Sequence, residues 1–191
     1  MSTPFSRVVR GVEQPTKVTS KAPPAHGFVG SGWLHPLTGI DHMLAMIAVG
    51  AWSTQLGKRA VFSVPAAFVA AMLFGGVLDF ERFVVPGIEL GIALSVVMLG
   101  FAIALEHRMP VLLAALGVGL FGMCHGYAHG YEIPGMESTW VYACGFLITT
   151  ASLHLIGAVG GILILEHTRG SRWLRFAGAL TATIGCYLLI R

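Results

Sequence analysis

Long apolar segments, separated by short connections that hold charge, glycine or proline, constrain this sequence more than any other feature. A helix needs about 20 predominantly apolar residues to cross the hydrocarbon core of a bilayer. Of the 191 residues, 55% are hydrophobic and only 11% are charged, whereas soluble domains carry about 25% charged residues. This composition excludes a cytosolic domain, a disordered chain and a nucleic-acid-binding protein. We therefore predict an all-α integral membrane protein, a bundle of about six transmembrane helices.

The apolar runs give the expected transmembrane helices directly. Five of them are uniform, and the first is weaker because Asp41 and His42 lie in its first turns. Residues 1–25 are polar and basic, which predicts a flexible tail, and residues 26–191 are expected to form a single transmembrane domain. The six predicted spans are Leu37–Leu56, Ala60–Leu78, Val84–Leu105, Pro110–Cys124, Trp140–Leu165 and Trp173–Ile190.

The basic residues orient this bundle. Cytoplasmic connections of membrane proteins carry an excess of Lys and Arg. Basic residues here concentrate in the connections after the first, third and fifth spans, whereas the connections after the second and fourth spans hold mainly acidic residues. The pattern predicts an N-terminus outside the cytoplasm. The basic residues are Lys58, Arg59, Arg108, Arg169, Arg172 and Arg175.

A first cluster of ionisable residues opens the first span. Pro36 suits the first position of a helix, which would place His35 at the helix entrance. His35 and His42 are seven residues apart, almost two helical turns, so they would share one face with Asp41 nearby. Imidazole and carboxylate donors suit borderline divalent cations such as Ni²⁺, Co²⁺ or Zn²⁺. The cluster predicts a metal site, and the alternative is a polar helix entrance at the headgroup level.

A second cluster follows the fourth span. His125 and His129 are four residues apart and Glu132 lies three further on, so all three fall on one helical face. Glycines at four-residue spacing in this segment permit close backbone approach by another helix. The pattern predicts a second set of metal ligands, and the alternative is an interfacial turn of aromatic and histidine residues.

Several single residues and pairs are weaker candidates. His154 lies in the middle of the fifth span, where it is either a metal ligand or a histidine bonded to a neighbouring helix. Glu89 lies in the first turn of the third span, where the helix dipole already stabilises a carboxylate. Two pairs end the third and fifth spans and are either a cytoplasmic exit path for a metal ion or ordinary helix ends. These pairs are Glu106-His107 and Glu166-His167.

Four segments resemble, in the same order, motifs of the HupE/UreJ family of membrane nickel permeases. The resemblance implies a multi-pass protein of the bacterial inner membrane that delivers Ni²⁺ for hydrogenase or urease maturation. The segments are His35–Trp52, Pro86–Gly100, His125–Glu132 and Gly145–Gly157.

Carried over residue by residue, the resemblance implicates two metal-engaging sets. It implies Ni²⁺ as the transported substrate, with no organic cofactor, and a cytoplasmic nickel chaperone is a candidate partner. The first set is His35, Asp41 and His42, and the second is His125, His129 and Glu132.

Three classes of function remain open at this point. The favoured class is a secondary permease, because the sequence holds no P-loop that would couple transport to ATP. The second class is a zinc-dependent intramembrane hydrolase, in which the histidines and Asp41 hold a metal-activated water. The third class is a haem cytochrome with axial histidines on facing helices, which the neighbouring carboxylates disfavour.

Overall fold

The computed structural model describes residues 31–80, 86–130 and 139–190, and within these ranges the chain forms helices and no strand. The tail expected at residues 1–25 and the candidate ligand Glu132 lie outside the described residues. The helices are α1 (Ser31–Thr38), α2 (Ile40–Leu56), α3 (Ala60–Phe80), α4 (Ile88–Ala104), α5 (Val111–Gly130), α6 (Thr139–Leu165) and α7 (Gly170–Ile190).

Four of these helices, α3, α5, α6 and α7, are long and apolar enough to cross a membrane. Helices α2 and α4 have 17 residues each. At 1.5 Å per residue they are about 25 Å long, close to the thickness of the hydrocarbon core. The all-α membrane bundle predicted from the apolar runs is therefore confirmed.

Glycines set which helices pair. A Cβ atom at Gly126 of α5 would overlap the backbone of Met72 on α3, and one at Gly50 of α2 would overlap the backbone of His154 on α6. A Cβ atom at Gly178 of α7 would lie 2.6 Å from the backbone N of Ala104 at the end of α4. Small residues let membrane helices approach closely and gain van der Waals contact, because lipid offers no hydrophobic drive for association. The resulting pairs are α3 with α5, α2 with α6 and α4 with α7.

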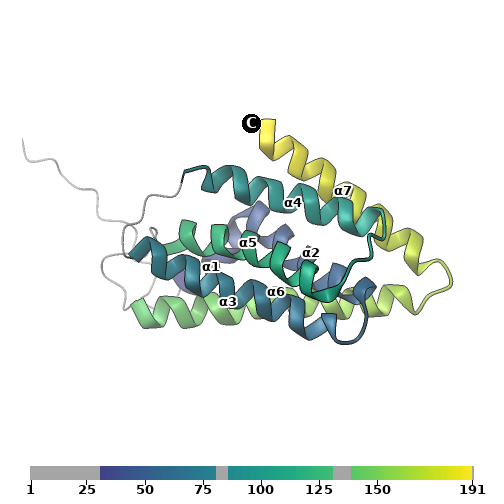
Figure 1. Cartoon of the computed structure of the whole chain (residues 1–191), viewed down its shortest axis with the longest axis horizontal. Coiled ribbons are helices and arrows are strands. Elements are labelled where there is room, and N and C mark those ends of the chain that lie inside the picture. Colours follow the sequence, from purple (N-terminus) through teal and green to yellow (C-terminus); the bar gives the residue numbers. More distant parts are fainter. Residues whose placement is uncertain (1–30, 81–85, 131–138, 191) are drawn as a thin grey trace, which may run out of the picture.

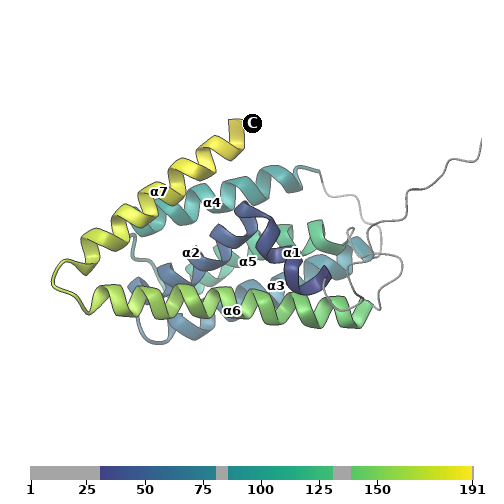
Figure 2. The ribbon, with the colours of Figure 1, turned by 180° about the vertical axis from the view of Figure 1, so that it is seen from behind.

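The helices alternate in direction, so the bundle has two distinct ends. The connections α2–α3, α4–α5 and α6–α7 all lie at the end on the right in Figure 1, and Figure 2 shows the same end from behind. The basic residues that the sequence analysis assigned to the cytoplasmic side, such as Lys58, Arg108 and Arg169, lie in these connections. The helices α4 and α6 begin at the opposite end.

Apolar side chains cover the surface of the bundle, and the interior holds polar side chains among apolar ones. Large apolar residues such as Phe62 (80% exposed) and Leu112 (69% exposed) face outward, as expected where lipid is the solvent. The interior contains apolar residues together with a set of buried hydroxyls and imidazoles. These buried polar residues are Ser53, Ser95, His125, His129, Thr149, Thr150 and His154.

The first predicted span differs from the observed helices. Pro36 lies inside α1 and is not the first residue of a helix, so that prediction was wrong. The helical conformation is interrupted at Gly39, whose backbone is extended (φ −83°, ψ 111°), and α2 begins after it. His35 and His42 therefore belong to different helices, and the helical spacing that placed them on one face does not apply.

Candidate metal site

Histidines from two helices meet beside the N-terminus of α2. The ring of His42 lies 4.5 Å from the ring of His125 and 4.4 Å from the ring of His129, measured between centroids. The fourth predicted span ends at Cys124 in the sequence analysis, but α5 continues to Gly130. Its last two turns carry both histidines to α2, so the two sequence clusters form one site.

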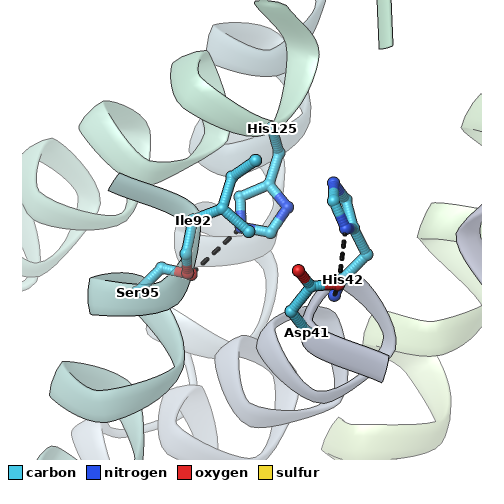
Figure 3. A network of polar contacts seen from close by, with 5 residues as sticks. All are labelled: Asp41, His42, Ile92, Ser95 and His125. Carbon is cyan, nitrogen blue, oxygen red and sulfur yellow. Dashed lines mark hydrogen bonds and ion pairs between the residues drawn. The ribbon is translucent and has the colours of Figure 1, made fainter. Parts of the chain in front are cut away.

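Asp41 orients the ring of His42. The Oδ1 atom of Asp41 lies 2.9 Å from Nδ1 of His42 and accepts the backbone N–H of His42 at 2.8 Å (Figure 3). An ionised carboxylate only accepts hydrogen bonds, so Nδ1 carries the proton and donates it to Asp41. The lone pair of a neutral His42 is then on Nε2, which is buried without a hydrogen-bond partner among the described residues. Carboxylates fix metal-binding histidines in this way.

The break at Gly39 makes room for this pair. A Cβ atom at Gly39 would lie 3.0 Å from Oδ1 of Asp41 and 3.0 Å from Nδ1 of His42. Any side chain at this position would therefore crowd both groups. The glycine that ends α1 thus lets Asp41 and His42 fold back over the first turn of α2.

Burial increases from Asp41 inward. The side chain of Asp41 is 31% exposed and that of His42 is 12% exposed. His129 is 5% exposed and packs on Phe146 of α6, with 4.2 Å between ring centroids, while His125 is fully buried. The acidic group therefore lies at the accessible side of the site and the imidazoles lie behind it.

His154 is close to this site but separated from it by an aromatic ring. The fully buried Phe68 of α3 lies 5.4 Å from His125 and 5.1 Å from His154, measured between ring centroids. His154 itself is almost fully buried, with only 3% of its surface exposed. Sequence reasoning identified His154 but gave no reason to expect Phe68 beside it.

Sequence reasoning also missed Ser95, which reaches the site from α4. Its Oγ lies 3.0 Å from Nε2 of His125 (Figure 3), and the residue is fully buried. A serine in the middle of an apolar span, one turn after Gly91, is the signal that could have identified it, because small residues mark the helix face that approaches a neighbour.

Other predicted residues do not join these contacts. The side chain of His35 and all of Glu132 lie outside what the structure describes, and Glu89 is exposed in the first turn of α4. Within residues 31–80, 86–130 and 139–190, no three His, Cys, Asp or Glu side chains already form a group that could hold a metal ion. The ring of His42 packs against the rings of both His125 and His129.

The candidate exit residues have local partners at the other end of the bundle. Glu106 adopts a left-handed backbone (φ 50°), and the N–H groups of Glu106 and His107 bond to carbonyls of the last turns of α4, a common way to end a helix. The carboxylate of Glu106 accepts a hydrogen bond from Ser171. His167 follows the end of α6, and its Nδ1 lies 2.9 Å from the carbonyl oxygen of Leu163 in that helix. Glu166 is exposed.

Comparison with known proteins shows which sequences this chain resembles. The family model described as HupE / UreJ protein matches residues 15–188. A protein of Rhizobium leguminosarum bv. viciae, Protein HupE, is 42% identical over 173 residues, which cover 87% of this chain and 90% of that protein. No solved structure matches the chain.

Proposed function

We propose that this chain is a secondary permease that moves Ni²⁺ into the cytoplasm, because it belongs to the HupE/UreJ family of hydrogenase and urease accessory transporters for nickel or cobalt. Proteins of this family are transporters, so the chain is not an enzyme. The observation that carries the proposal is the contact of His42 with His125 and His129, beside the carboxylate of Asp41. Ionisable groups inside a membrane bundle are costly and mark substrate or ion pathways.

The donor set suits a transported ion. Imidazole and carboxylate groups bind Ni²⁺ and Co²⁺, while the soft thiolates that retain metal tightly are absent from the described contacts of this cluster. The rings touch but do not preform a closed site. An ion therefore has to draw the donors of His42, His125 and His129 together, and this favours exchange over permanent retention.

We place the entrance at Asp41. Its carboxylate attracts the cation, His42 and His129 receive it, and His125 binds it at greater depth, in the order of increasing burial. His154 is the next donor inward, behind Phe68. His35, Glu89 and Glu132 are proposed contributors near the entrance, on the strength of their sequence positions.

The basic end of the bundle supports an orientation with that end in the cytoplasm. The connections after α2, α4 and α6 carry Lys58, Arg59, Arg108 and Arg169, and basic connections remain on the cytoplasmic side. The histidine site and the N-terminus then face the periplasm of a bacterial inner membrane. A divalent ion moving inward gains about 4.6 kcal/mol per 100 mV of membrane potential, which permits accumulation without ATP. The delivered metal would serve hydrogenase or urease maturation, through a cytoplasmic nickel chaperone.

Uptake of radioactive nickel into cells that express the chain tests this function. We expect uptake that depends on the membrane potential and that Co²⁺ in excess reduces more than Mg²⁺ does, because Mg²⁺ prefers oxygen ligands. Uptake no faster than in cells with an empty vector, at verified membrane abundance, would contradict the proposal.

Replacing His107 and His167 together with Ala tests the exit path separately. We expect wild-type uptake, because His167 bonds to the carbonyl of Leu163 in the last turn of α6 and His107 lies in the turn that ends α4. The measurement is the initial uptake rate and the nickel affinity of the purified variant. Slower release into the cytoplasm with unchanged affinity would instead assign these residues to a metal relay.

A further inference from the structure

Ser95 makes two contacts that together determine the proton on His125. Its Oγ lies 2.6 Å from the carbonyl oxygen of Ile92, one turn earlier in α4, and 3.0 Å from Nε2 of His125 (Figure 3). Ser95 and His125 are both fully buried, so water does not compete for either contact. A serine hydroxyl has one hydrogen to donate and lone pairs that accept.

The direction of each hydrogen bond follows from these partners. The carbonyl of Ile92 only accepts, so the hydroxyl hydrogen of Ser95 points to it. The contact with His125 then requires Nε2 to carry the proton and donate it to Oγ. A neutral imidazole has one N–H, so the lone pair of His125 is on Nδ1. This atom is buried and has no hydrogen-bond partner among the described residues.

We propose that Ser95 is a positioning residue of the metal site, which holds His125 in the tautomer that offers Nδ1 to a cation. This inference rests on the proposed function and adds a residue to it. Ser95 does for His125 what Asp41 does for His42, since each binds the N–H of its imidazole and leaves the other nitrogen as a donor. Partners of this kind orient ligands and set affinity in metal sites.

The approach of α4 to α5 depends on Gly91, one turn before Ser95. A Cβ atom at Gly91 would lie 2.7 Å from Sγ and 3.3 Å from Cβ of Cys124, the residue next to His125. The absence of a side chain at Gly91 therefore brings the two helices close enough for a short serine side chain to reach the imidazole.

Ser53 offers a matched control. It is fully buried like Ser95, and its Oγ donates to the carbonyl of Gly50 at the same 2.6 Å and the same spacing of three residues. It makes no described contact with a histidine. Ser53→Ala thus removes an equivalent hydroxyl and its hydrogen bond to a helix carbonyl, and it leaves the metal site unchanged. Ser95→Thr is a second control, because threonine retains the hydroxyl at the site.

The first measurement reads the tautomer without metal. Nuclear magnetic resonance of ¹⁵N-histidine-labelled protein in detergent micelles distinguishes protonated from unprotonated ring nitrogens, with the His125 signals assigned by their loss in His125→Asn. We expect the Nε2–H form in the wild type, in Ser95→Thr and in Ser53→Ala, and a mixture of forms in Ser95→Ala. A wild-type His125 with its proton on Nδ1, or an unchanged tautomer in Ser95→Ala, would overturn the inference.

The second measurement is the Kd of purified protein for NiCl₂. We expect Ser95→Ala to raise the Kd about 10–100-fold, the usual loss when a partner that orients a metal ligand is removed. Ser95→Thr and Ser53→Ala should keep the wild-type Kd. An unchanged Kd in Ser95→Ala overturns the positioning role. Absence of nickel binding by the wild type overturns the proposed function itself, and the tautomer measurement distinguishes that failure from an error in the hydrogen-bond assignment.

Discussion

Cells that carry the Asp41→Asn variant should take up nickel at limiting concentration about 100-fold more slowly than wild type, close to the rate of cells without the protein. Asparagine has the shape of aspartate and can still accept a hydrogen bond from His42, so the change removes the charge and little else. In the wild type, the charge of Asp41 attracts the cation at the accessible side of the site and strengthens the 2.9 Å contact with Nδ1 of His42. Hydrogen bonds to charged groups are about twice as strong as neutral ones.

Asp79→Asn is the control for this variant. Asp79 is a partly buried carboxylate in the last turn of α3, where it makes no described contact with the histidines. The measurement is the initial uptake rate across a range of nickel concentrations, divided by the amount of protein in the membrane fraction. Wild-type uptake by Asp41→Asn at limiting nickel would refute the entrance role, as would an equal loss in Asp79→Asn.

Gly126→Ala should destabilise the folded protein by about 3 kcal/mol or more, the upper end of the usual cost of overpacking. The new methyl group would overlap the carbonyl of Met72, a backbone atom that cannot move without shifting α3. The residue follows His125, so separating α3 from α5 also displaces the imidazoles. We expect lower membrane abundance and a lower midpoint of unfolding in detergent.

Gly117→Ala on the same helix is the matched control. A Cβ atom at Gly117 would meet nothing within 4 Å. The substitution should leave stability unchanged or raise it by up to about 1 kcal/mol, because alanine favours helix over glycine. Equal unfolding midpoints for the two variants would show that close contact at Gly126 does not limit stability.

Much of the site was predictable because its chemistry depends on residue types. Aspartate and histidines inside apolar spans cost free energy and so indicated function before any geometry was known. The spacing of His125 and His129 placed them on one helical face, and α5 continues through both. The prediction that His35 shares a helical face with His42 was wrong, because Pro36 lies inside α1 and the helix is interrupted at Gly39.

Small residues at Gly91 and Ser95 indicate a packed face of α4, but the contacts of Ser95 and Phe68 with His125 could not be predicted from their own segments. Both are ordinary residues of apolar helices, and they gain significance only through contact with His125 from a different part of the chain. A pairing between α4 and α5 depends on the shapes of two surfaces, such as the gap at Gly91 that admits Cys124. No periodic pattern in either segment carries that information.

The sequence by itself determined that the chain forms membrane-spanning helices, because apolar segments in lipid must satisfy their backbone hydrogen bonds internally. It also determined which side chains could bind a cation. The tertiary structure decided which helices pair and which donors meet. In lipid both the outer and the inner faces of a helix are apolar, so hydrophobic periodicity does not mark the buried face as it does in water. Close packing at glycines determines which helix faces are buried against one another, and it brings His42, His125 and His129 together.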